Sequence, residues 1–349
     1  MWMQALAART KSVAAFLFGL VLCGCSIHPL PDDVANISTV NIVRQVRCET
    51  RQAVIDSLFR YLTSEDNLRG NLLNGRKLDQ HSFDIGVQAK AAYDVDPDSI
   101  TRFDPSRLTG FARSVVELLY HTGIAYNYDL TGLEINNIDP VVNFLRPVPL
   151  ISTVSLGLTG TFDRQRQNER SFTITDNFGS LVTKVPEIYC KKHIVEANIV
   201  YPIAGRVGID RVVHDFLLLT LFENLSGLSS DVKKTLTPTG PPTMVDQLQF
   251  ITAIGGGATP KVTFIPKGRT FQTSDASLPL SISRKDTHLL TVGLYLDQTA
   301  AKEIGGVRTA MFQGGLITAS GGRAEQGAAL AVEQFLTQKI FKPTIVVGQ

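Results

Sequence analysis

An apolar run near the N-terminus constrains this chain more than any other stretch of its sequence. Residues 13–22 read VAAFLFGLVL, and Arg9 and Lys11 precede them. An α-helix needs about 20 apolar residues to cross the hydrocarbon core of a bilayer, and this run has half of that. A basic flank and a short apolar run are typical of a signal peptide, which is removed on export. The sequence therefore predicts that residues 1–24 take no part in the fold.

The apolar run ends on Leu22, Cys23, Gly24 and Cys25. This ending resembles the lipobox of bacterial lipoprotein precursors, in which an aliphatic and two small residues precede an obligatory cysteine. The resemblance implies cleavage behind Gly24 and lipidation of Cys25. Two or three acyl chains would anchor the protein stably, because each buried CH₂ contributes about 0.8 kcal/mol. An ordinary secretory signal with a cysteine-rich cleavage region is the alternative.

The net charge excludes one class of partner. The 34 basic residues include Arg9 and Lys11, so the chain from Cys25 onward has 32 basic and 32 acidic residues and is formally neutral. Nucleic-acid binding depends on an excess of Lys and Arg that neutralises phosphates. We therefore expect no nucleic-acid partner. A chain of this length can bury one large core or two small ones.

Two cysteines remain once Cys23 leaves with the signal and Cys25 carries lipid. They are Cys48 and Cys190. In an oxidising compartment, two remaining cysteines are more often paired than free, which predicts a Cys48–Cys190 disulfide. The alternative is a pair of buried thiols that behave as small hydrophobic side chains.

The periodicity of apolar residues predicts the secondary structure. Spacings of three and four residues indicate helices. They occur over Ile37–Leu62, Ser106–His121, Gly208–Asn224 and Ala324–Gln338. Alternation indicates strands. It occurs over Phe83–Val95, Ile124–Leu130, Met244–Ala253, Lys261–Ile265 and Thr287–Leu296, and over 152–163 and 170–178 as a hairpin whose tip is 164–170. The run Gly255–Gly257 predicts a turn.

These elements predict an α+β fold, in which a mainly antiparallel, sandwich-like sheet packs with several helices. The expected organisation is a signal peptide over 1–24, a lipidated tether over 25–36, the α+β domain over 37–300 and a Gly/Ala-rich C-terminal segment with one helix over 301–349. An outer-membrane barrel is disfavoured. The internal helices, the lipid anchor and the long gaps between strands argue against it.

Three short motifs make the body of the chain similar to uncharacterised proteobacterial lipoproteins. They are Val46-Arg47-Cys48-Glu49, Thr259-Pro260-Lys261-Val262 and Arg284-Lys285-Asp286-Thr287. That resemblance implies no mechanism.

The search for catalytic or metal chemistry gives no site. The six histidines show neither HExxH nor HxH spacing, so we expect no metal. Asp94, Asp96 and Asp98 alternate, but the Gly and Glu of an EF-hand loop are replaced by Ser99 and Pro105. No G-x-S-x-G elbow is present, and the glycine run lacks the spacing of a phosphate loop. We therefore predict no catalytic residue and no cofactor.

The sequence leaves two functional hypotheses. The first is a non-enzymatic protein anchored to the membrane by its N-terminal lipid, which binds an unknown envelope protein or envelope component. Ser26 follows the lipidated position, and a residue other than Asp there implies the periplasmic face of the outer membrane. The second is a periplasmic hydrolase or carbohydrate-active enzyme whose site residues are scattered along the chain. A Ser–His pair or convergent carboxylates in a deep pocket would favour the second.

Overall fold

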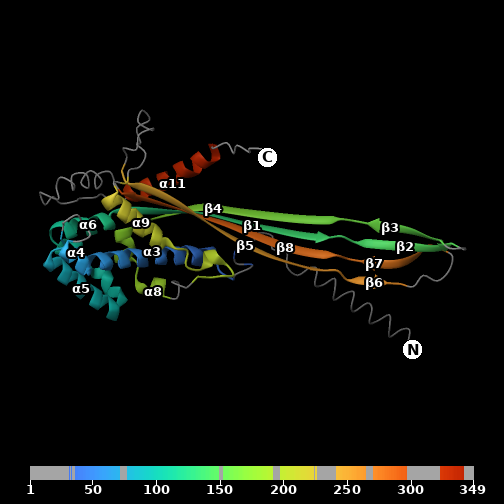
Figure 1. Cartoon of the computed structure of the whole chain (residues 1–349), viewed down its shortest axis with the longest axis horizontal. Helices are drawn as coiled ribbons and strands as arrows, with labels where there is room; N and C mark the ends of the chain where they lie inside the picture. The colour runs from blue at the N-terminus through green and yellow to red at the C-terminus, as the bar shows by residue number, and fades with distance from the viewer. Residues whose placement is uncertain are drawn as a thin grey trace. The chain divides into compact units, whose positions relative to one another are not determined.

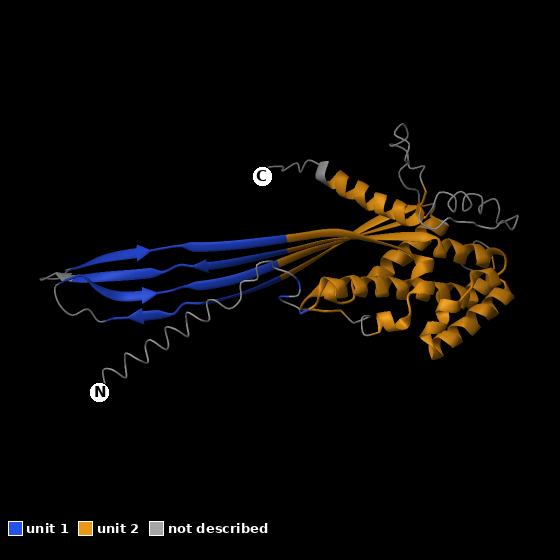
Figure 2. Cartoon of the chain, turned by 180° about the vertical axis from the view of Figure 1, so that it is seen from behind, with its two compact units in different colours: residues 1–36, 132–168, 253–285 blue, residues 37–131, 169–252, 286–349 orange. Residues whose placement is uncertain are grey.

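The computed structural model describes residues 31, 33, 36–70, 77–148, 152–191, 197–223, 225, 241–264, 270–296 and 323–341. They form helices and two antiparallel four-stranded sheets, so the predicted α+β class is confirmed (Figure 1). The chain divides into two compact units (Figure 2). Residues 132–168 and 253–285 belong to unit 1 with 1–36, and the remaining residues belong to unit 2. None of the described helices is long and apolar enough to span a bilayer.

The helices that the structure describes all lie in unit 2. They are α3 (Thr39–Leu62), α4 (Glu65–Arg69), α5 (Gln80–Val95), α6 (Gly110–Tyr120), α7 (Phe178–Lys184), α8 (Glu187–Cys190), α9 (Ile209–Phe222) and α11 (Arg323–Phe341), with 3₁₀ turns η1 (Pro97–Arg102), η2 (Pro105–Arg107) and η3 (Pro202–Ala204). Helix α3 begins where Ser38 caps it, because the Ser38 hydroxyl accepts the backbone N–H of Asn41 at 3.2 Å. The helices predicted over 37–62, 106–121 and 208–224 correspond to α3, α6 and α9.

Helix α5 corrects the strand that we predicted over Phe83–Val95. Asp79 caps the helix by accepting the N–H of Ser82 at 2.9 Å, and Lys90 pairs with Asp94 one turn later at 2.7 Å. The alternation was misleading because several of its apolar members do not pack. Val87 and Val95 are exposed, whereas Ile85 is buried.

The eight described strands form two hairpins, each made of four consecutive strands. The first hairpin comprises β1 (Thr122–Ile138), β2 (Val141–Val148), β3 (Ser152–Thr159) and β4 (Phe162–Asn177), and the second comprises β5 (Thr243–Ala258), β6 (Lys261–Thr263), β7 (Gln272–Ser277) and β8 (Leu280–Leu296). One sheet has the order β4-β1-β8-β5 and the other β3-β2-β7-β6. Strands β1, β4, β5 and β8 contribute residues to both units.

Two local predictions about these hairpins were wrong. Residues 164–170 are not a hairpin tip, because they lie inside the continuous strand β4. The glycines Gly255–Gly257 do not turn the chain, because they lie inside β5. The backbone of a neighbouring strand approaches Gly257 closely, because a Cβ there would lie 3.0 Å from the Leu280 carbonyl oxygen.

Helix α11 packs against strands of unit 2 through small residues. Ala328 and Val332 of α11 form a buried cluster with Ala125 of β1. A Cβ on Gly293 of β8 would lie 2.6 Å from a Val332 methyl group, so the helix approaches the strand where a side chain is missing. This helix overlaps the one expected over Ala324–Gln338.

Candidate functional site: an aliphatic groove between α3, α6 and α9

The motif Val46-Arg47-Cys48-Glu49 connects α3 to three other elements of unit 2. Arg47 donates to both carboxylate oxygens of Asp176 on β4, each at 2.7 Å, and to the Tyr189 hydroxyl on α8 at 3.2 Å. The hydrogen bond to Asp176 raises the pKa of Arg47, so the guanidinium stays charged. Arg44, one turn earlier, places its guanidinium 5.0 Å from the Tyr189 ring centre. These contacts fix α8 and β4 on α3.

The predicted disulfide between Cys48 and Cys190 is present. It joins α3 to α8 with a Cα–Cα distance of 5.4 Å across 142 residues of sequence. Both cysteines are buried, and the alternative of two free thiols does not hold. The bridge closes a long loop, which is where a disulfide constrains the unfolded chain most.

Glu49 fixes the beginning of α9. Its Oε1 accepts the backbone N–H groups of Gly208 at 2.7 Å and Ile209 at 2.9 Å, and its Oε2 accepts that of Val207 at 2.9 Å. Gly208 stands at the N-cap with φ 93°, a conformation that favours glycine, and it has no side chain to cap the helix. Glu49 supplies the acceptor instead. Burial raises the pKa of Glu49, while the three N–H donors oppose that rise.

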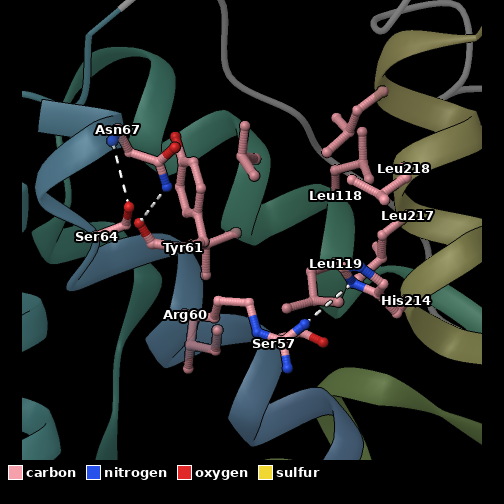
Figure 3. Close-up of a pocket in the computed structure, with 14 residues that line it drawn as sticks. Ser57, Arg60, Tyr61, Ser64, Asn67, Leu118, Leu119, His214, Leu217 and Leu218 are labelled. Carbon is pink, nitrogen blue, oxygen red and sulfur yellow. Dashed lines mark hydrogen bonds between the residues drawn. The ribbon is translucent and has the colours of Figure 1, made fainter. Parts of the chain in front are cut away.

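Helices α3, α6 and α9 line a groove of about 440 Å³. Its walls are mostly aliphatic side chains of α3, α6 and α9 (Figure 3), namely Leu58, Val115, Val116, Leu118, Leu119, Leu217, Leu218 and Leu221. The polar lining residues are Ser57, Arg60, Tyr61, Ser64, Asn67 and His214. A groove of this size with mainly apolar walls and a few polar groups has the character of a small-molecule site.

Two of the polar residues of the groove, Arg60 and His214, contact each other. Arg60 Nη1 lies 3.3 Å from His214 Nδ1, and because a guanidinium only donates, Nδ1 is the acceptor of this hydrogen bond (Figure 3). The exposed guanidinium keeps other donors, and the ring keeps its Nε2–H. This end of the groove therefore offers positive charge and N–H donors to an acidic group.

Ser57 and Ser64 are the serines in the lining of the groove. Ser64 accepts the backbone N–H of Asn67 at 3.3 Å and so caps α4. Among the described residues, no hydrogen bond joins His214 to Ser57 or Ser64. In the part of the chain that the structure describes, no three His, Cys, Asp or Glu side chains lie together so that they could hold a metal ion.

A second polar cluster is buried elsewhere in unit 2. The Tyr201 hydroxyl lies 2.9 Å from Asp286 Oδ2 and 2.5 Å from His288 Nε2. All three side chains are at most 2% exposed, so no substrate reaches them. The cluster connects Tyr201, which precedes the 3₁₀ turn η3, to strand β8. Asp286 of the third sequence motif is therefore a structural residue.

The sequence found part of this arrangement. It predicted the Cys48–Cys190 pair, whereas Cys25 and its lipobox lie outside the described residues. The groove residues and Glu49 were missed. Glu49 belongs to the motif Val46-Arg47-Cys48-Glu49, which is similar to a motif of other lipoproteins. Its role as a hydrogen-bond acceptor could not be predicted, because its partners begin at Val207, far along the chain.

The fold and the groove define an α+β protein with one buried disulfide and an aliphatic site between helices. The chain belongs to the family described as uncharacterised protein y4kA, whose model matches residues 28–309. It is 28% identical over 289 residues to the uncharacterised protein y4kA of Sinorhizobium fredii, covering 81% of this chain and 82% of the relative.

Solved structures show only a remote likeness. The secretin domain of InvG from the Salmonella SPI-1 injectisome has a TM-score of 0.15 at 6% identity, and covers 65% of this chain and 71% of that one. A cryo-EM structure of the InvG secretin has a TM-score of 0.11 at 6% identity, and covers 61% of this chain and 76% of that one. Similarities this low carry no argument about fold or function.

Proposed function

We propose that this chain is a lipid-anchored protein of the bacterial cell envelope, which binds a component with an aliphatic chain and an acidic head group. The observation that carries the location is the buried Cys48–Cys190 disulfide. Structural disulfides form and persist in oxidising compartments and are rare in the cytosol. The lipobox ending on Cys25 supports the same location and supplies the anchor.

The groove between α3, α6 and α9 supports the choice of ligand. Its walls are mainly aliphatic, which suits a flexible hydrocarbon chain better than a flat ring. Arg60 and His214 offer N–H donors at one part of the lining, where a carboxylate or phosphate would receive charge-assisted hydrogen bonds. An acyl chain with an anionic head fits both parts of the lining.

The anchor is tested by metabolic labelling. Cells that express the full precursor are grown with radiolabelled palmitate, and Cys25→Ala is compared with the wild type. We expect label in the wild-type protein and none in Cys25→Ala. Label that persists in the variant would place the lipid elsewhere and contradict the anchor.

The ligand is tested with a fluorescent fatty acid, 11-(dansylamino)undecanoic acid, on a chain that carries Cys25→Ser. Leu218→Trp fills the groove from an exposed position on α9, and Leu330→Trp, exposed on α11, is the matched control. We expect Leu218→Trp to weaken binding at least about tenfold, which corresponds to ~1.4 kcal/mol. Leu330→Trp should leave it unchanged. Equal affinity in all three proteins would contradict a ligand in this groove.

The alternative of a periplasmic hydrolase or carbohydrate-active enzyme stays a prediction. His214→Ala is its test, because His214 is the ionisable imidazole in the groove. An esterase or glycosidase activity of the purified protein that this variant abolishes would favour the enzyme over the binding protein.

A further inference from the structure

Tyr61 brings a polar group into the lining of the aliphatic groove. It lies on α3 next to Arg60, and its side chain lines the groove together with aliphatic side chains of α6 and α9. Its hydroxyl oxygen is buried and forms no hydrogen bond with any described residue. A buried polar group without a partner destabilises a fold, so its presence calls for an explanation other than stability.

The hydroxyl lies away from the charged part of the groove. Figure 3 shows Tyr61 with Ser64 and Asn67 on one side of the groove, and His214 on the other. The Asn67 side chain donates its Nδ2–H to the backbone carbonyl of Tyr61 at 2.9 Å, and the Ser64 hydroxyl accepts the backbone N–H of Asn67 at 3.3 Å. These contacts hold the backbone around Tyr61 in place and leave its hydroxyl unused.

The Tyr61 hydroxyl keeps its proton and can therefore donate a hydrogen bond. Burial raises the pKa of Tyr61, and the negative charge of Asp79 acts in the same direction. Asp79 itself accepts the Ser82 N–H at 2.9 Å and the Thr109 hydroxyl at 2.8 Å. A neutral phenol in an apolar groove offers one O–H donor, which suits an uncharged oxygen of a ligand.

Tyr128 provides a comparison from the interior of the same unit. Its hydroxyl is also buried and has no hydrogen-bond partner among the described residues. Its ring stacks on Phe172 with the ring centres 5.0 Å apart, and it does not line the groove. Tyr61 therefore differs from Tyr128 in facing the space that a ligand of the groove would fill.

We infer that the groove selects acyl chains that carry a hydroxyl group in addition to their acidic head. The acidic head meets Arg60 and His214, the hydrocarbon lies against the aliphatic walls, and Tyr61 donates to the hydroxyl on the chain. The Tyr61 oxygen is shielded from water, so its ring tilts as the ligand enters. A site that pairs with a ligand hydroxyl rejects the analogue without it, because the site's own polar group is then left unpaired. This inference rests on the proposed function, since it names a subclass of the ligand proposed there.

Displacement of 11-(dansylamino)undecanoic acid from the chain with Cys25→Ser tests the selection. The competitors are dodecanoic acid, 3-hydroxydodecanoic acid and 12-hydroxydodecanoic acid, which place the hydroxyl near the head or at the far end of the chain. An unpaired hydroxyl weakens the transfer of a chain into an apolar groove. Tighter binding of a hydroxy acid is therefore a sign of a specific partner. We expect at least one hydroxy acid to bind about tenfold more tightly than dodecanoic acid.

Tyr61→Phe removes the hydroxyl and keeps the ring. We expect it to abolish the preference for the hydroxy acid and to leave the affinity for dodecanoic acid within about twofold. Tyr128→Phe, the matched control, should keep the preference. Neither change removes a hydrogen bond among the described residues, so thermal unfolding followed by circular dichroism should show no loss of stability.

Two results would overturn the role of Tyr61. One is equal or weaker binding of both hydroxy acids relative to dodecanoic acid, and the other is a preference that persists in Tyr61→Phe. If dodecanoic acid binds and Leu218→Trp excludes it, either result overturns the selection alone and leaves the proposed function intact. Failure of all three acids to bind would contradict both.

Discussion

Replacement of Glu49 tests how the structure positions α9 and therefore the groove. Its two carboxylate oxygens accept three backbone N–H groups at 2.7 to 2.9 Å. Glu49→Ala leaves these donors without their acceptor in a buried place. Loss of an N-cap costs about 0.5–2 kcal/mol, and each buried unsatisfied donor costs about 1–3 kcal/mol, with partial relaxation. We expect Glu49→Ala to lower the free energy of unfolding by about 3–5 kcal/mol.

Glu49→Gln separates geometry from charge. A glutamine oxygen at the Oε1 position still accepts from Gly208 and Ile209, but its amide nitrogen would face the N–H of Val207. We expect a cost of about 1–2 kcal/mol, between the wild type and Glu49→Ala.

The measurement for both variants is urea unfolding followed by far-ultraviolet circular dichroism, with the disulfide intact. Asp94→Ala is the control, since Asp94 pairs with Lys90 one turn away at 2.7 Å on the surface of α5. Such an exposed pair contributes about 0.3–0.5 kcal/mol. A cost for Glu49→Ala no larger than that of Asp94→Ala would refute the reasoning.

Two further predictions concern the disulfide and the cap of α5. The Cys48→Ala/Cys190→Ala double variant should lose up to about 5 kcal/mol of stability in the chain-entropy model for a 142-residue separation, and a fall in Tm of only one or two degrees would contradict it. Asp79→Ala should cost about 1 kcal/mol at pH 7. Burial acts to raise the pKa of Asp79, but hydrogen bonds from Ser82 and Thr109 outweigh it, so the folded-state pKa is lowered. A lowered carboxyl pKa stabilises the fold above the unfolded value of about 3.9 and loses that effect as the pH falls. The cost of Asp79→Ala should therefore shrink in urea titrations from pH 7 to pH 3, and a cost that grows would contradict it.

The sequence predicted the fold class because its helices bury one face over several turns. Ile42, Val46 and Leu58 of α3 recur at helical spacing and are buried, so the pattern and the packing agree. Helix α5 was mistaken for a strand because it is mostly exposed. Its alanines fit either period, and an exposed helix leaves no burial signal in its sequence.

Long-range contacts explain what could not be predicted. Residues 164–170 are polar inside β4 because both faces of that part of the strand are largely exposed, and a polar exposed strand looks like a loop in sequence. The groove draws its aliphatic lining from three helices, and sequence periodicity does not distinguish a core face from a groove wall. The disulfide was found by counting alone, since removal of Cys23 and Cys25 leaves one pair.

Peptide mass spectrometry of the protein from bacterial membranes tests the central claim, that this is a lipid-anchored protein of an oxidising envelope compartment. The protein is digested without reduction. The account predicts an N-terminal peptide that begins at Cys25 and carries the mass of diacylglycerol, and a cross-linked pair of peptides that contains Cys48 and Cys190. An N-terminal peptide from residues 1–24, or free thiols at Cys48 and Cys190, would contradict it.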